Sequence, residues 1–135
     1  MREILFRGKQ KGIMNWVEGT GVFTDGINTW LSANEPNRPI AYGLKHKIVL
    51  SETVGQFTGL TDKNGKKIFE GDVLQFNYTG KNHGVEGKAT VIFEHGKFGV
   101  LWGWHKEIVC LDGFADTTIE VIGNIHDNPE LLENP

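Results

Sequence analysis

Cysteine is almost missing from this sequence, which excludes a fold held together by disulfides. Cys110 is the only cysteine among 135 residues, so no disulfide can form within the chain and nothing points to an oxidising compartment. It lies in the apolar run 108–111, where a thiol is typically a small buried side chain rather than a reactive group.

Long apolar runs and targeting signals are also missing. Residues 1–11 carry charges throughout and lack the apolar core of a signal peptide. No uninterrupted apolar stretch approaches the roughly 20 residues that a membrane-spanning helix needs. We therefore expect a cytoplasmic protein that has no membrane as a partner.

Familiar catalytic and metal-binding motifs are absent as well. The sequence has no nucleophile elbow, P-loop or dinucleotide fingerprint, and its five histidines form neither an i, i+4 pair nor a zinc-ligand set with cysteine. Glu70 and Asp72 flank Gly71 and would serve as acid and base only in a cleft. The commoner role of such an Asp is to accept backbone hydrogen bonds within its own turn. We predict that the protein is not an enzyme and binds no metal or cofactor.

Positive charge is lacking at the C-terminal end. Residues 112–135 hold six acids and no Lys or Arg, a net charge of −6. Residues 1–111 hold all 14 Lys and Arg against 11 acids, a net charge of +3. Because an acidic segment repels phosphate, the sequence favours a protein over a nucleic acid as the partner.

Glycine, by contrast, is abundant, with 18 residues spread between short runs of Val, Ile, Phe and Trp. This pattern predicts an all-β fold of short antiparallel strands joined by many turns. We expect a single domain over residues 1–135 whose core, residues 52–126, is a small SH3-like barrel. Residues 1–51 would add a hairpin and loops, and residues 127–135 a short helix and tail.

The first fifty residues predict a hairpin followed by loops. Its strands are expected at 2–7 and 13–17, with a basic turn at 8–12 between them and an end at 18–21. Residues 24–39 contain two prolines, which stop any helix, so they are expected to form a long connection with Trp30 as an anchor. Two short strands, 40–44 and 48–50, are expected around a turn at 45–47.

The central stretch, residues 53–76, predicts a hairpin and then a tight corner at Gly71. Its turn can close in two ways. Asn64 and Gly65 alone would form a two-residue type I′ turn. A type I turn that begins at Asp62 would instead place Gly65 in the left-handed region as a bulge. In both cases Gly65 needs a positive φ.

The clearest register in the sequence lies in residues 89–102. A two-residue loop at His95 and Gly96 pairs apolar side chains with each other on one face. These pairs are Phe93 with Phe98, Val91 with Val100, and Ala89 with Trp102, while Glu94 faces Lys97 at the loop. A slip of one residue would break every pair, so the register is well specified.

Exposed aromatics are the strongest functional signal. Trp102 and Trp104 share one face of an extended strand. Either both belong to the core, or Trp104 lies past the paired region and offers a flat surface to a peptide, a partner protein or a base. The candidate binding residues are Trp102, Trp104, His105, Lys106, and, if their loops fold to the same end, Trp30 and Tyr78.

Several stretches in a fixed order carry a family resemblance: residues 2–7, 53–60, 62–65, 68–73 and 121–132. Together they resemble the YopX family of phage and prophage proteins. The resemblance implies an all-β fold with a small barrel core and a phage-associated protein in the cytoplasm of the host bacterium. It implies no reaction. We expect a non-enzymatic binding or interaction module with an unknown protein partner, with a nucleic-acid-binding small β-barrel as the alternative. Open strand edges would also allow a homo-oligomer.

Overall fold

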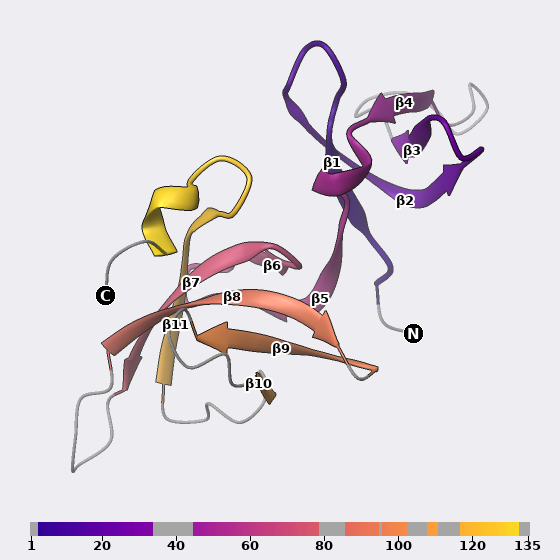
Figure 1. Ribbon diagram of the computed structural model, residues 1–135. Helices are drawn as coiled ribbons and strands as arrows, with labels where there is room; N and C mark the ends of the chain where they lie inside the picture. The colour runs from indigo at the N-terminus through magenta and orange to yellow at the C-terminus, as the bar shows by residue number, and fades with distance from the viewer. Residues whose placement is uncertain are drawn as a thin grey trace. The chain divides into compact units, whose positions relative to one another are not determined.

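The computed structural model describes residues 3–33, 45–78, 86–94, 96–102, 108–110 and 117–132 (Figure 1). Most of these residues are strands, which form two antiparallel sheets, and the described helices are short 3₁₀ turns. The all-β prediction is confirmed. Within the described ranges, none of the helices has the length and apolarity needed to cross a membrane.

The chain divides into two compact units, Met1–Phe57 and Thr58–Pro135. The first holds β1 (Phe6–Lys9), β2 (Trp16–Thr24), β3 (Thr29–Ala33), β4 (Lys45–Val49) and the 3₁₀ helix η2 (Ser51–Thr53). Strand β5 (Gly55–Thr61) begins in the first unit and ends in the second. The second holds β6 (Lys67–Phe69), β7 (Asp72–Tyr78), β8 (Glu86–Glu94), β9 (Lys97–Trp102), β10 (Ile108–Cys110), β11 (Thr117–Asn124) and η4 (Pro129–Leu132). The SH3-like barrel and the domain limits expected from the sequence stay predictions.

The four strands of the first unit close on themselves. Each of β1 to β4 pairs antiparallel with the next. Directly after β1, Gln10 forms a bridge with Val49 of β4, and the Lys11 N–H donates to the Ile48 carbonyl at 2.9 Å. The strands therefore form a ring of hydrogen bonds, and β4 has no open edge next to Ile48.

Small and apolar residues fill the inside of this ring. Leu31 and Val49 are buried there. A Cβ added to Gly8 would lie 3.2 Å from the Val49 Cβ, which is tighter than ordinary van der Waals contact. Gly8 thus faces inward and lets β1 and β4 approach each other closely.

The N-terminal hairpin exists, but its second strand does not stop where the sequence suggested. The prediction that this strand ends at residues 18–21 is wrong, because β2 continues through a register shift between Gly19 and Gly21. Glycines tolerate the backbone of a bulge, so they bend this strand instead of ending it. The first half of β2 consequently pairs with β1 and the second half with β3.

Two expected loops also contain strands. The prediction of a long connection over residues 24–39 is wrong for residues 29–33, because these residues form β3. The expected turn at residues 45–47 is wrong as well, because these residues begin β4. In both places the backbone pairing of a sheet outweighs local polar composition. The expected strand 40–44 lies outside the described residues.

The second unit carries a five-stranded sheet in the order β10-β9-β8-β7-β11. Every pair expected in the 89–102 hairpin is present, from Glu94 with Lys97 to Ala89 with Trp102, and Figure 1 shows β8 and β9 side by side. Strand β10 pairs with β9, and β11 pairs with β7. Its buried core consists of Ile68, Leu74, Phe76, Ala89, Val91 and Val100, with Phe98, Ile119 and Val121 packed against it.

The turn between β5 and β6 is the bulged form. Gly65 has a φ of +80°, whereas Met14 is the only non-glycine residue with a positive φ in the described part of the chain. A type I′ turn needs a positive φ at Asn64 too, so that alternative is wrong. The Asp62 N–H donates to the Lys66 carbonyl at 2.8 Å and closes the turn.

The corner before β7 is held by backbone and by one buried carboxylate. Gly71 has a φ of +91°. The Phe69 N–H donates to Oδ2 of Asp72 at 2.8 Å, as expected for an Asp that stabilises its own turn. The Gly71 N–H also donates to the Val91 carbonyl at 2.8 Å, and the corner is thereby tied to β8.

The expected short C-terminal helix is the 3₁₀ turn η4. It packs closely on the end of β11: a Cβ added to Gly123 would lie 2.6 Å from Oδ1 of Asn128 and 2.8 Å from Cδ1 of Leu131. Asn128 also accepts a hydrogen bond from the Asn124 N–H at 3.3 Å. Glycine at 123 is therefore what allows the chain end to lie on the sheet.

Candidate binding surface

The candidate residues from the sequence are only partly covered by the structure. Trp104, His105 and Lys106 lie outside the described residues. For two others the backbone alone is described: Trp102 pairs with Ala89 and Tyr78 pairs with Thr117. A shared aromatic surface around Trp104 stays a prediction.

Trp30 is fully described, and it lies in a row of apolar side chains across three strands. The register places Phe23 of β2 opposite Trp30 of β3, and Trp30 opposite Ile48 of β4. Their strand neighbours Leu31 and Val49 are buried inside the ring at 0% and 3% exposure, whereas Phe23 is 46% and Ile48 39% exposed. Because side chains alternate along a strand, Phe23, Trp30 and Ile48 face outward. We call these three residues the aromatic row.

The rings beside the row have a defined arrangement. The Phe23 and Trp30 rings stack with centroids 5.3 Å apart and an interplanar angle of 16°. The His46 and Phe23 rings meet edge to face, with centroids 5.2 Å apart and an interplanar angle of 85°. Nδ1 of His46 lies 3.1 Å from Oγ of Ser32, a hydrogen bond that helps to fix the orientation of the ring. These contacts hold an exposed π surface in place before any ligand arrives.

A second aromatic position lies on the other half of β2. Lys9 pairs with Trp16, so the two side chains lie on the same face. This face is the outer one, because Gly8, which precedes Lys9, faces inward. The guanidinium carbon of Arg7 lies 4.7 Å from the Trp16 ring centroid, and Nζ of Lys9 lies 5.9 Å from it. Both distances fit cation–π contacts, so positive charge is held beside this half-buried ring.

The ends of the aromatic row differ in character. At one end, the exposed Lys11 lies next to Ile48, because the Lys11 N–H donates a hydrogen bond to the Ile48 carbonyl. Beyond Phe23, the β2–β3 turn carries Ile27, which is 89% exposed. In that turn Asp25 accepts hydrogen bonds from the backbone N–H groups of Asn28 and Ile27, which lower the pKa of its carboxyl.

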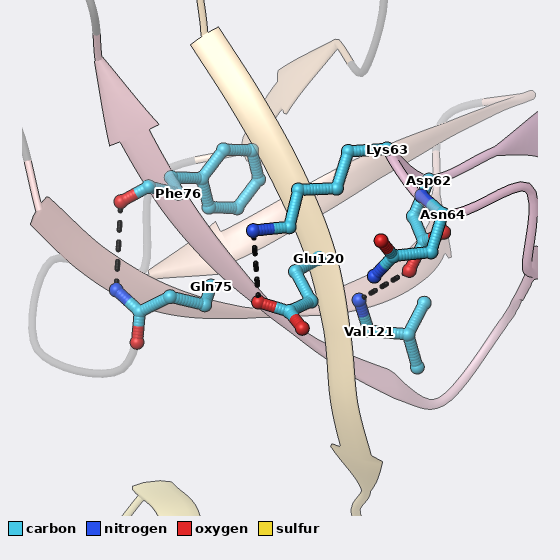
Figure 2. A network of polar contacts seen from close by, with 7 residues as sticks. All are labelled: Asp62, Lys63, Asn64, Gln75, Phe76, Glu120 and Val121. Carbon is cyan, nitrogen blue, oxygen red and sulfur yellow. Dashed lines mark hydrogen bonds and ion pairs between the residues drawn. The ribbon is translucent and has the colours of Figure 1, made fainter.

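The polar network of the second unit is structural rather than a site. Asp62 is buried, and its carboxylate accepts bonds from the N–H groups of Asn64 at 2.8 Å and Lys66 at 2.9 Å. It also accepts a bond from the Val121 N–H at 3.0 Å (Figure 2). Burial on its own raises the pKa of this carboxyl, but the three backbone bonds, led by that from Val121, bring the pKa below its usual value. A carboxylate held as an anion by three donors is a poor proton acceptor.

An exposed ion pair accompanies this anchor. Nζ of Lys63 lies 3.3 Å from Oε2 of Glu120 (Figure 2). The Lys63 N–H also donates to the Ile119 carbonyl at 2.9 Å. The turn between β5 and β6 is thus fastened to β11. Across the described ranges, no three His, Cys, Asp or Glu side chains gather as metal ligands would.

Sequence reasoning missed Phe23, His46 and Ile48. The available signal was the turn that begins at Asp25: pairing outward from Asp25–Asn28 sets Thr24 opposite Thr29 and then Phe23 opposite Trp30. It was hidden because Thr, Asn and Ser around Trp30 resemble a loop. No comparable signal in the sequence indicates that Ile48 would lie next in the row.

Comparisons with known proteins give a family model and a solved structure to which this chain is similar. The family model described as YopX protein matches residues 5–133. The chain is also similar to the crystal structure of protein EF1440 from Enterococcus faecalis, with 27% sequence identity and a TM-score of 0.57. That similarity covers 98% of this chain and 100% of the other. No curated protein matches this sequence.

Proposed function

This chain belongs to the YopX family, and on that premise we propose that it is a phage- or prophage-associated accessory protein that works as a non-enzymatic binding module. It would act in the cytoplasm of the host bacterium. The association with phages is what the family resemblance implies. The binding role has its own support in the surface of the first unit.

The aromatic row is the observation that supports this function. Phe23 and Ile48 expose 46% and 39% of their surface although both lie within paired strands. Contiguous apolar side chains on an outer face typically mark an interaction site, and aromatic residues dominate binding energy when a partner covers them. Trp30 adds a ring that stacks against the ring of Phe23.

The closed ring restricts how a ligand can bind. A peptide often binds by adding a strand to an open sheet edge. Beside Ile48 that edge is already occupied, because the Lys11 N–H bonds to its carbonyl. Recognition at the aromatic row would therefore depend on side chains, which makes it sensitive to single substitutions.

Affinity capture from a host lysate tests the proposal. Immobilised wild type, Phe23→Ala and the control Phe93→Ala are compared, and bound protein and nucleic acid are both quantified. Phe93 is a suitable control because it is 51% exposed and also contacts another ring, that of Phe98. We expect at least one bound component to be lost with Phe23→Ala and kept with Phe93→Ala. Equal recovery with all three proteins would refute a binding role for the row.

A further inference from the structure

We infer that the ligand of the aromatic row is a single-stranded nucleic acid, DNA or RNA. This inference rests on the proposed binding function and names the chemistry of its ligand. Bases would stack on the ring surface that Phe23 and Trp30 build, and the phosphates would meet the cations around it. Three observations carry it: the local charge, the ring geometry and the second aromatic position.

The charge of the first unit is opposite to that of the second. Residues 1–57 hold seven Lys and Arg against five Asp and Glu, a net charge of +2, whereas residues 58–135 hold seven against twelve, a net charge of −5. The overall charge of −3 therefore comes from the second unit. Because salt screens charges beyond about 10 Å, a phosphate at the row responds mainly to charges near it.

The cations lie beside the aromatic side chains. Lys11 is exposed directly next to Ile48, and Arg7 and Lys9 lie over the Trp16 ring. Lysines next to exposed rings are the usual combination in surfaces that bind single strands, where the rings take the bases and the lysines the backbone. An apolar protein partner would gain nothing from these charges.

The rings have the form that a base requires. Phe23 and Trp30 already stack nearly parallel, and a flat base would extend this stack on the exposed Phe23. Trp16 stands seven residues before Phe23 on the same strand, at a distance of roughly 20 Å along β2. A strand of several nucleotides would span both aromatic positions. Duplex DNA, whose bases are stacked inside, could not use either ring.

Fluorescence anisotropy with fluorescein-labelled 15-nucleotide oligo(dT) and oligo(U), at about 50 mM salt, tests the inference. Stacking of one base on one aromatic side chain corresponds to about a 5- to 150-fold change in Kd on substitution by alanine. We expect Phe23→Ala to weaken binding by that factor, Phe23→Tyr to restore it, and Phe93→Ala to leave it unchanged. Thermal melting of each variant checks that the fold is intact. The two oligonucleotides show whether the strand bound is DNA or RNA.

A pair of charge reversals tests the phosphate contacts separately. Lys11→Glu and Lys88→Glu change the net charge equally, and both lysines are exposed, but Lys88 lies in β8 of the second unit. We expect Lys11→Glu alone to weaken binding and to make the dependence of log Kd on log salt shallower, by about 0.7 for one lost contact. Equal effects of the two reversals would overturn a local phosphate site.

The outcomes separate this inference from the proposed function. If neither oligonucleotide binds, or if Phe23→Ala binds both as the wild type does, the nucleic-acid inference is overturned. Should lysate capture still depend on Phe23 in that case, the binding function stands with a protein as the ligand. If capture is independent of Phe23 as well, both proposals fall.

Discussion

Asp62 offers the sharpest test of how the second unit is held together. Its two carboxylate oxygens accept three backbone N–H bonds, of which the bond from Val121 joins residues 59 positions apart. In Asp62→Asn one oxygen becomes an NH₂ group that points at an N–H donor. If the remaining oxygen still accepts the hydrogen bonds from Asn64 and Lys66 within the turn, the Val121 N–H loses its charged acceptor. Bonds of this kind contribute about 1.5–3 kcal/mol, so we expect the free energy of unfolding to fall by about 2–3 kcal/mol.

The free energy of unfolding is measured by urea denaturation monitored by circular dichroism, with Lys63→Ala as the matched control. Lys63 is the next residue, and its side chain makes the ion pair with Glu120, in which the two side chains are 43% and 38% exposed. Exposed pairs contribute about 0–1 kcal/mol, and the Lys63 backbone bond to Ile119 survives the substitution. The reasoning fails if Asp62→Asn destabilises the protein no more than Lys63→Ala.

Acid gives an independent check on the same carboxylate. The folded-state pKa of Asp62 lies below its unfolded value of about 3.9, so its contribution is fully present above that pH and is lost as the pH falls through the folded pKa. Wild type and Asp62→Asn should therefore differ most in stability near neutral pH, and the difference should shrink below about pH 4. A difference that stays constant down to pH 2 would show that the charge of Asp62 does not stabilise the fold.

Two glycine substitutions test other parts of the second unit. Gly65→Val forces a β-branched residue to a φ of +80° and should lower the free energy of unfolding by about 1–3 kcal/mol, measured by urea unfolding. The matched control is Gly65→Asn, because Asn adopts a positive φ more readily and should cost less; equal losses for both variants would contradict the argument. Gly123→Ala places a Cβ 2.6 Å from Oδ1 of Asn128, so we expect η4 to separate from β11; faster amide hydrogen exchange at residues 128–132, with the β8–β9 hairpin unchanged, would show this, and unchanged exchange would contradict it.

The 89–102 hairpin was predictable because two independent features of the sequence determine its register. Alternation assigns one face to the core, and the loop at Gly96 fixes which residues oppose each other. A one-residue slip would expose Val91 and Val100, both almost completely buried, so no other pairing competes. Sequence patterns determine a strand pair well when adjacent strands are joined by a short turn and one face is apolar throughout.

The first unit was predicted less well because its pairing depends on features without a periodic signal. Strand β2 bends at Gly19–Gly21 and changes partners there, and glycine in a sequence indicates a strand end as readily as a bulge. Strand β4 begins with two lysines and a histidine, a composition typical of turns. The closure of β4 onto Gln10 joins residues 39 positions apart, which no local pattern specifies.

Buried polar side chains and exposed apolar side chains have different roles in this protein. Asp62 and Asp72 are buried, and each accepts backbone hydrogen bonds that hold a turn, so their charges serve the fold. Phe23 and Ile48 do the reverse. They face away from the buried interior of the ring, where Leu31 lies, and a polar residue at either position would leave that interior intact. Apolar side chains that the fold does not require on the outside are best explained by a ligand that covers them.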